Sequence, residues 1–133
     1  MKYLLDTHTL IWALEGNPKL PQQICEIICN ENNIIYVSVA SIWEITLKEK
    51  KKANFPYKAE EIVKYCQSAG YIFLSIGVES VINTNSLIVK ADEYVNCDPF
   101  DNLLVSQCKI NNMILITHDS VMKHYNEGCL LIY

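Results

Sequence analysis

Four acidic residues, far apart in the sequence, each stand where a predicted strand ends or a predicted helix begins. Asp6 ends the first apolar run and Asp119 follows a later one, whereas Glu44 and Asp101 lie in the early turns of two predicted helices. In an open parallel sheet, all these points belong to the edge where ligands bind, outside the carboxyl ends of the strands. We therefore expect the four carboxylates to converge.

Converging carboxylates need a counter-charge. Two unit charges about 4 Å apart repel by about 4 kcal/mol at an effective dielectric of 20, so protons or a cation must neutralise the cluster. Oxygen ligands favour Mg²⁺ or Mn²⁺, which activate water and stabilise charge on a phosphate. We predict that Asp6, Asp101 and Asp119 hold one or two ions, with Glu44 as ligand or water-orienting base. This is the chemistry of phosphodiester hydrolysis.

Each acid also has a purely structural explanation. Asp6 can cap the first helix, Asp98 can cap the helix that Pro99 opens, and Asp119 in Thr-His-Asp-Ser suits a turn. Asp101 would then be only the third residue of its helix. Helix capping does not, however, require acids from four segments to share one edge, so their joint placement favours chemistry.

Polar neighbours of the acids are candidates for supporting roles. Thr7 and Thr117 could orient carboxylates or water from an outer shell. Lys48 lies four residues after Glu44, on the same helix face, and is the best single candidate for substrate contact. The alternatives are an ion pair between Glu44 and Lys48, or a capping box between Glu44 and Ser41.

The elements that position these residues alternate along the chain. Strands are predicted at 2–5, 34–37, 71–76, 113–117 and 129–133, and helices at 9–15, 21–29, 38–52, 59–69, 78–95 and 98–111, with a short one after 120. Alternating strands and helices indicate a mostly parallel sheet covered on both faces. We predict one three-layer α/β/α domain over residues 1–133, with about five strands.

Composition limits the classes of protein to consider. The 133 residues carry a net charge of −4 with eleven lysines and no arginine, which argues against a protein that simply coats nucleic acid. Six cysteines without a C-x-x-C pair favour a reduced, cytoplasmic protein, and no apolar stretch approaches membrane-spanning length. The spacing of His8 and His118 does not predict a zinc site. We expect Trp12, Trp43, Phe100 and the tyrosines to serve as core or dimer contacts rather than as base-stacking platforms.

Four motifs together resemble PIN-domain ribonucleases, especially the VapC-type toxins of bacterial toxin–antitoxin pairs. They are LLDTHTLIW at 4–12, SIWE at 41–44, DPFDNLLVSQ at 98–107 and ITHD at 116–119. The resemblance implies a metal-dependent endoribonuclease with Asp6, Glu44, Asp101 and Asp119 at the four acidic positions, and Asp98 as a cap or outer-shell partner. It also implies an RNA substrate, a homodimer and a cognate antitoxin that covers the active site.

One position departs from this resemblance, and two other functions remain open. Asn102 stands where many relatives carry arginine after the D-P-F-D motif, so any phosphate or antitoxin contact of that arginine is in doubt. An aspartyl-phosphate phosphatase of the haloacid-dehalogenase type would also place Asp6 after the first strand, but its D-x-D-x-T motif would need an acid at His8. The other possibility is a non-catalytic binding module whose acids only cap helices.

Overall fold

The central element is a five-stranded parallel sheet, seen in a computed structural model that describes residues 1–51, 54–90 and 98–133. Its strand order is β3-β2-β1-β4-β5, and every neighbouring pair is parallel. The strands are β1 (Lys2–Leu5), β2 (Ile34–Ser38), β3 (Ile72–Leu74), β4 (Ile114–Thr117) and β5 (Leu130–Ile132). The predicted parallel sheet is confirmed, although β3 and β5 are shorter than expected.

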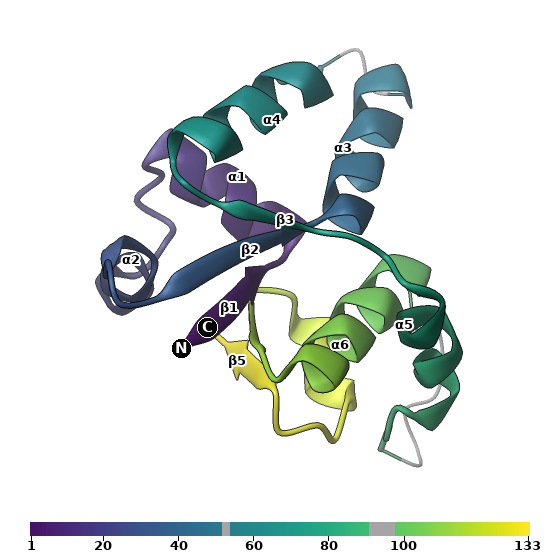
Figure 1. The fold of residues 1–133 in the computed structure, drawn as a ribbon. Coiled ribbons are helices and arrows are strands. Elements are labelled where there is room, and N and C mark those ends of the chain that lie inside the picture. Colours follow the sequence, from purple (N-terminus) through teal and green to yellow (C-terminus); the bar gives the residue numbers. More distant parts are fainter. Residues whose placement is uncertain (52–53, 91–97) are drawn as a thin grey trace.

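Helices cover both faces of this sheet, with α1, α2 and α4 on one side and α6 on the other (Figure 1). The helices are α1 (Thr7–Glu15), α2 (Gln22–Cys29), α3 (Val39–Lys51), α4 (Ala59–Ser68), α5 (Val78–Asn83) and α6 (Pro99–Asn111), and the 3₁₀ turns are η1 (Thr84–Ser86) and η2 (Ser120–His124). This is the predicted three-layer α/β/α arrangement. No helix in the described ranges is long and apolar enough to cross a bilayer.

Two hydrophobic cores lie on opposite faces of the sheet because side chains alternate along each strand. Leu5 packs into the core with Leu10 of α1 and Ile62 of α4. Its neighbour Leu4 packs into the second core with Leu104 of α6. All five of these leucine and isoleucine side chains are almost fully buried. The alternation fixes which face of the sheet each helix covers, and hence where the helix ends lie.

The long helix predicted over 78–95 is confirmed only as far as residue 83 and is wrong over the described residues that follow, 84–90. Helix α5 ends at Asn83, η1 follows, and Val89 forms an antiparallel bridge with Tyr125; the remainder, from residue 91, lies outside the described residues. Short polar side chains compete with helical hydrogen bonds at this point. The Thr84 hydroxyl donates to the Val81 carbonyl at 2.6 Å, and the Asn83 amide donates to Ser106 Oγ at 3.2 Å.

The capping box proposed for Glu44 and Ser41 is also wrong. Helix α3 begins at Val39, directly after β2, so Ser41 lies inside the helix. Its hydroxyl is buried and has no hydrogen-bond partner among the described residues. The turn into α3 is instead stabilised by Ser38, whose hydroxyl accepts from the Ala40 amide at 3.0 Å. Because α3 starts three residues earlier than a Ser41 cap would place it, Glu44 sits in its second turn.

Candidate active site

The acidic residues gather at the carboxyl edge of the sheet, where the chain changes direction. Strand β1 pairs with β2 on one side and with β4 on the other. The connections after β1 and β4 therefore diverge, leaving the kind of crevice in which α/β proteins bind ligands. Asp6 directly follows β1 and Asp119 follows β4 by two residues. The topology brings both to this edge although 113 positions separate them in sequence.

Asp6 is almost fully buried, with 5% of its surface exposed, and both its oxygens are engaged. Oδ1 accepts from the Thr9 amide at 2.7 Å, which caps α1, and Oδ2 accepts from the Thr117 hydroxyl. The Thr117 oxygen in turn accepts from the Asp119 amide at 3.1 Å. Thr117 thus joins the ends of β1 and β4 and holds Asp6 in a fixed orientation.

Glu44 is linked to both neighbouring side chains proposed for it. The Thr7 hydroxyl donates to Glu44 Oε2 at 3.3 Å, and Lys48 Nζ lies 3.4 Å from Glu44 Oε1. Glu44 and Lys48 are both partly exposed, so the pair contributes little to stability. Its consequence is positional, because it places one ammonium group beside the acidic edge. The Thr7 hydrogen bond to Glu44 is the contact that ties α3 to the start of α1.

Helix α6 brings two further acids to the same edge. Asp98 is exposed and caps α6, its Oδ1 accepting from the amides of Phe100 at 2.7 Å and Asp101 at 3.4 Å. Asp101 lies in the first turn, where its carboxyl is partly buried. The capping explanations for Asp6, Asp98 and Asp119 are therefore all confirmed, since Asp119 Oδ1 also accepts from the Val121 amide at the start of η2.

The pKa of the Asp101 carboxyl reflects the proximity of the other acids. Its pKa is raised from 3.8 to about 7, mainly by burial and then by the negative charges of Asp98, Asp119, Glu44 and Asp6, in that order. All four predicted acids, with Asp98, therefore share one electrostatic environment. Their roles as catalytic or metal-binding residues remain predictions, but the structure does bring them together.

The donor chemistry at this edge fits a hard divalent ion. The side chains offer only carboxylate and hydroxyl oxygens, and the acids' mutual repulsion would fall when a cation bound. Within the described ranges, however, no three His, Cys, Asp or Glu side chains stand close enough together to enclose an ion. Mg²⁺ is commonly held by one or two carboxylates, with water and substrate phosphate completing its shell, so a three-acid cage is not required.

A buried network that sequence reasoning missed fixes α6 against the sheet. The Ser38 hydroxyl donates to Gln107 Oε1 at 2.7 Å, and Gln107 Nε2 donates to the Ser75 carbonyl at 3.2 Å. Both Ser38 and Gln107 are fully buried. The network therefore sets the positions of the two helices that carry Glu44 and Asp101. Gln107 gave no signal in a single sequence, because a glutamine among apolar helix residues is usually a surface residue.

Asn102, the departure from the arginine expected here, has a structural contact of its own. The Tyr125 hydroxyl donates to Asn102 Oδ1, linking the first turns of α6 to the segment after η2. The Asn102 side chain thus makes a tertiary contact within the fold. The positive charge that an arginine would supply at this position is missing. Lys48, through its ion pair with Glu44, places an ammonium group beside the acids instead.

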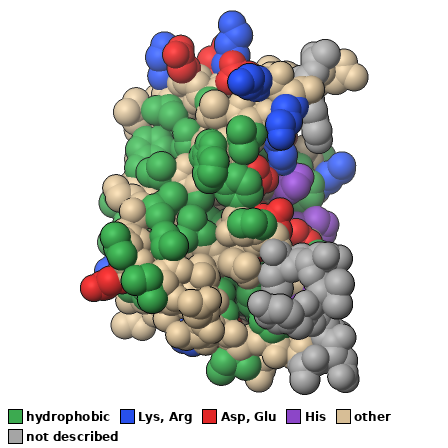
Figure 2. Space-filling model, turned by 90° about the vertical axis from the view of Figure 1, so that its right-hand side faces the viewer, with side chains coloured by type: hydrophobic (Ala, Val, Ile, Leu, Met, Phe, Trp, Pro, Cys, Tyr) green, Lys and Arg blue, Asp and Glu red, His purple; other side chains and the backbone are tan. Residues whose placement is uncertain are grey.

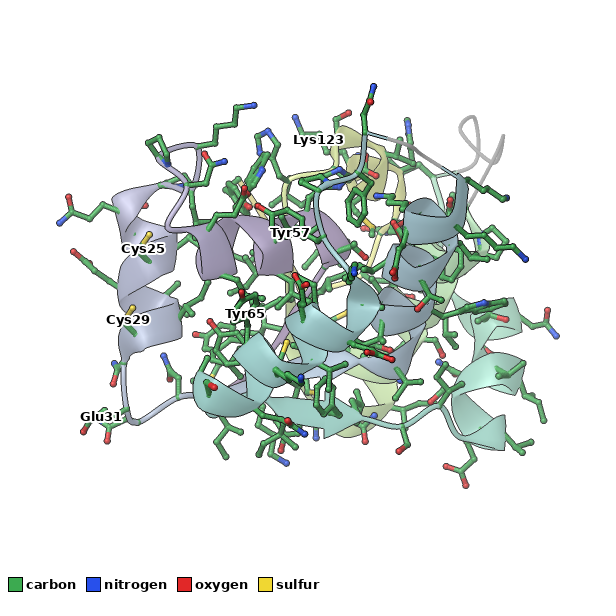
Figure 3. The ribbon with its side chains drawn as sticks, turned by 90° about the horizontal axis from the view of Figure 1, so that it is seen from above. Cys25, Cys29, Glu31, Tyr57, Tyr65 and Lys123 are labelled. Atoms are coloured by element: carbon green, nitrogen blue, oxygen red, sulfur yellow. The ribbon has the colours of Figure 1, made fainter. Side chains whose placement is uncertain are left out.

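A cavity of about 750 Å³ adjoins the acidic edge and shares Asp119 as part of its wall. We call it the aromatic pocket; its other principal lining residues are His8, Trp12, Lys19, His118, Lys123 and Tyr133. Lys123 projects from η2 (Figure 3). The expectation that Trp12 is simply a core contact is thus incomplete, because the ring is half-buried and also faces this cavity. No periodic pattern could reveal a pocket whose walls come from both ends of the chain.

The fold and the edge together define a class: three-layer α/β proteins with an acidic cluster at the carboxyl edge of a parallel sheet. Within that class the chain belongs to the PIN domain family, whose sequence profile matches residues 3–128. No protein with a curated description matches the chain.

Solved structures with the same fold include toxin–antitoxin complexes. The chain resembles VapBC2 from Rickettsia felis bound to a DNA fragment from its promoter, with a TM-score of 0.71 and 17% identity over 99% of this chain and 98% of the other. It is similar to DNA-bound VapBC from Salmonella typhimurium, with a TM-score of 0.71 and 15% identity over 99% and 98% of the two chains. The chain is also similar to VapBC-1 from nontypeable Haemophilus influenzae, with a TM-score of 0.61 and 16% identity over 90% of this chain and 87% of the other.

Proposed function

We propose that the protein is a metal-dependent endoribonuclease and the toxin of a type II toxin–antitoxin pair, acting as a single PIN-like domain. The observation that supports this proposal is the environment of Asp101 at the sheet edge. The nearby charges of Asp6, Glu44 and Asp119 contribute to raising the pKa of its carboxyl. A cluster of this kind is stable only when a counter-charge is present. A divalent ion would supply this counter-charge and would in turn attract the negative phosphodiester.

Asp6, Asp101 and Asp119 are the residues that would hold Mg²⁺ or Mn²⁺, with Glu44 as a further ligand or a base. When bound, the ion supplies positive charge to the phosphate and lowers the pKa of water. Thr117 keeps the Asp6 carboxylate oriented, and Thr7 does the same for Glu44. Glu44 can accept a proton from water, and Lys48 can contact a phosphate oxygen by exchanging its partner Glu44 for the substrate.

We also propose two protein partners, an antitoxin and a second copy of the chain. The similar structures are described as VapBC and toxin–antitoxin complexes, so we propose a cognate antitoxin that covers the acidic edge. We also propose a homodimer, because hydrophobic side chains gather on the face formed by α3 and α5 (Figure 2). This apolar face includes the exposed side chains of Val39 and Trp43 on α3, and Val78, Val81 and Ile82 on α5. The proposed location is the cytoplasm.

Replacing Asp6 tests the mechanism. Asp6→Asn keeps an oxygen that can cap α1 but removes the charge needed by a cation. We expect it to lower RNA cleavage at least 100-fold with Mn²⁺ present, with the circular dichroism spectrum unchanged, and EDTA to abolish wild-type cleavage. Glu79→Gln, on the exposed face of α5, is the matched control. Full activity of Asp6→Asn, or of the wild type in EDTA, would contradict the mechanism.

One observation favours a non-catalytic alternative, because Asp6, Asp98 and Asp119 do cap helices. Titration calorimetry with Mn²⁺ separates the two functions without an activity assay. The nuclease requires heat of binding that Asp101→Asn removes, whereas a binding module predicts none at millimolar metal. The phosphatase alternative predicts release of inorganic phosphate from small esters.

A further inference from the structure

The aromatic pocket is built from three separate parts of the chain that meet beside the acidic edge. His8 and Trp12 come from α1, Lys19 from the segment after it, and His118, Lys123 and Tyr133 from the C-terminal segment. Its volume of about 750 Å³ lies in the range of ligand-binding pockets. Asp119 lines the cavity and also belongs to the acidic cluster, so a ligand in the pocket would be next to the proposed reaction centre.

The aromatic rings in the pocket contact one another and are held in place. Trp12 lies with its ring centroid 5.1 Å from that of His118, and His118 lies 5.0 Å from Tyr133. His118 Nδ1 donates to the main-chain oxygen of Tyr133 at 2.7 Å. The Tyr133 hydroxyl and Thr9 Oγ1 are 2.8 Å apart and share a hydrogen bond. The rings are therefore ordered before any ligand binds, which lowers the entropic cost of binding.

The charge of the pocket differs from that of the whole chain. Lys19 Nζ stands 5.8 Å from the centre of the Trp12 ring, and Lys123 contributes a second ammonium group to the same cavity. Both lysines are exposed, as are His8 and His118. In a chain with a net charge of −4, this cavity thus combines two lysines and two histidines with one carboxylate, that of Asp119. Aromatic faces with adjacent cations are the features by which proteins bind unpaired nucleotides.

We propose that the aromatic pocket binds one unpaired nucleobase of the RNA substrate, adjacent to the phosphodiester at the acidic edge, with Lys19 and Lys123 supplying charge for neighbouring phosphates. This inference rests on the proposed nuclease function and extends it to how the substrate is held. Trp12 and His118 provide the stacking surface. Since bases in a duplex are already stacked, the pocket selects single-stranded RNA or a loop.

The test measures RNA binding in EDTA, where cleavage cannot interfere. The chain has two tryptophans, so Trp43→Phe leaves Trp12 as the only tryptophan, whose emission can be excited selectively over that of the tyrosines. Titration with a 12-nucleotide oligouridylate is expected to quench this emission, because a base stacks near the ring. Adding His118→Ala to that background should weaken binding about 5- to 100-fold, the range of one lost base–aromatic stack.

Lysine variants provide a second measurement that does not disturb the ring cluster. Lys19→Gln should reduce the slope of log Kd against log salt by about 0.7–1, the change for one lost phosphate contact with a single strand. Lys64→Gln removes the same charge from the exposed face of α4, far from the lining of the pocket, and should leave the slope unchanged. A 12-base-pair RNA duplex should bind the wild type and His118→Ala equally.

The outcomes separate this inference from the nuclease proposal. If the wild type shows no quenching, or if folded His118→Ala and Lys19→Gln bind oligouridylate as well as the wild type does, the aromatic pocket is not a base-binding site. That result leaves the cleavage test of Asp6→Asn standing. If the pocket variants lose binding while Asp6→Asn still cleaves RNA fully, the pocket is supported and the proposed mechanism is wrong.

Discussion

At the scale of single residues, the acidic edge combines structural and chemical demands on the same side chains. Asp6 caps α1 through one oxygen and contacts Thr117 through the other. Asp101 instead has a carboxyl whose pKa is raised to about 7 by burial and by neighbouring acids. Asp101 is therefore the group whose ionisation the fold opposes, and a cation would relieve the cost.

Because the fold opposes ionisation of Asp101, we predict that the stability of the protein in EDTA depends on pH in an unusual way. A carboxyl whose pKa is higher in the folded than in the unfolded state stabilises the fold below the unfolded value, and that contribution is lost as pH rises toward 7. Asp101→Asn removes the effect, so we expect it to raise stability at pH 8 by about 1–2 kcal/mol after allowance for solvent screening. The melting temperature would rise by several degrees.

Thermal melts in EDTA at pH 5 and pH 8 measure this difference. Asp101→Asn should melt higher than the wild type at pH 8 and much less so at pH 5. Glu79→Gln, which removes a charge from an exposed helix position, should follow the wild type at both pH values. An Asp101→Asn protein that is equally or less stable at pH 8 would show that the acids do not repel one another in the folded chain.

Thr117 should matter for both stability and activity. Thr117→Val removes the hydroxyl that joins Asp6 Oδ2 to the Asp119 amide, and leaves a buried carboxylate without that donor. We expect a loss of about 1–3 kcal/mol in urea unfolding and about a 10- to 100-fold loss of cleavage or metal affinity. Thr46→Val removes an exposed hydroxyl that donates within α3 and should change neither by much. Equal behaviour of the two variants would argue against the link.

At the scale of secondary-structure elements, the start of α6 can be tested with two substitutions at one position. Asp98→Ala removes both the charge and the cap, whereas Asp98→Asn removes the charge but keeps an oxygen for the Phe100 and Asp101 amides. We expect the alanine variant to be about 1 kcal/mol less stable than the asparagine variant in denaturant unfolding. Identical stabilities would mean that Pro99 alone fixes the helix start.

How far the sequence predicts these elements depends on which residues fix them. Local patterns specify the parallel sheet and the helices α1 and α6, because apolar periodicity and the Asp-Pro at the start of α6 can be read from the sequence. The edge that carries Asp6 and Asp119 follows from the same patterns. The end of α5 at Asn83 does not, because the Thr84 hydroxyl bonds back to the Val81 carbonyl and the Asn83 amide bonds to Ser106 on α6. The apolar spacing continues past that point and hides the break.

The parts of the site that escaped prediction depend on tertiary contacts. Gln107 bonds to Ser38, 69 positions away, and His118 meets Trp12 across the sheet edge. A single sequence shows neither pairing, since no period links such positions. The four acids could be predicted because the topology of a parallel sheet places strand ends together, independently of side-chain packing.

At the scale of the whole molecule, the apolar face on α3 and α5 requires an explanation. Val78 is 75% exposed, Ile82 64% and Trp43 57%. A contiguous apolar surface of this kind usually marks a protein interface. A partner bound to this face would cover side chains of α3 and α5. We therefore expect a second copy of the chain to cover it, with the two acidic edges remaining accessible to RNA.

The oligomeric state tests this expectation. Light scattering after size exclusion should give about twice the chain mass of 15.3 kDa for the wild type. Ile82→Glu and Trp43→Glu should give monomers, because a charge buried in an apolar interface is costly. Tyr65→Glu is the control, since Tyr65 is 53% exposed on α4, on the other side of the sheet from α6 (Figure 1). It should leave the dimer intact. A wild-type monomer at 100 μM, or dimers that persist in both variants, would place the contact elsewhere and leave the apolar face to another partner.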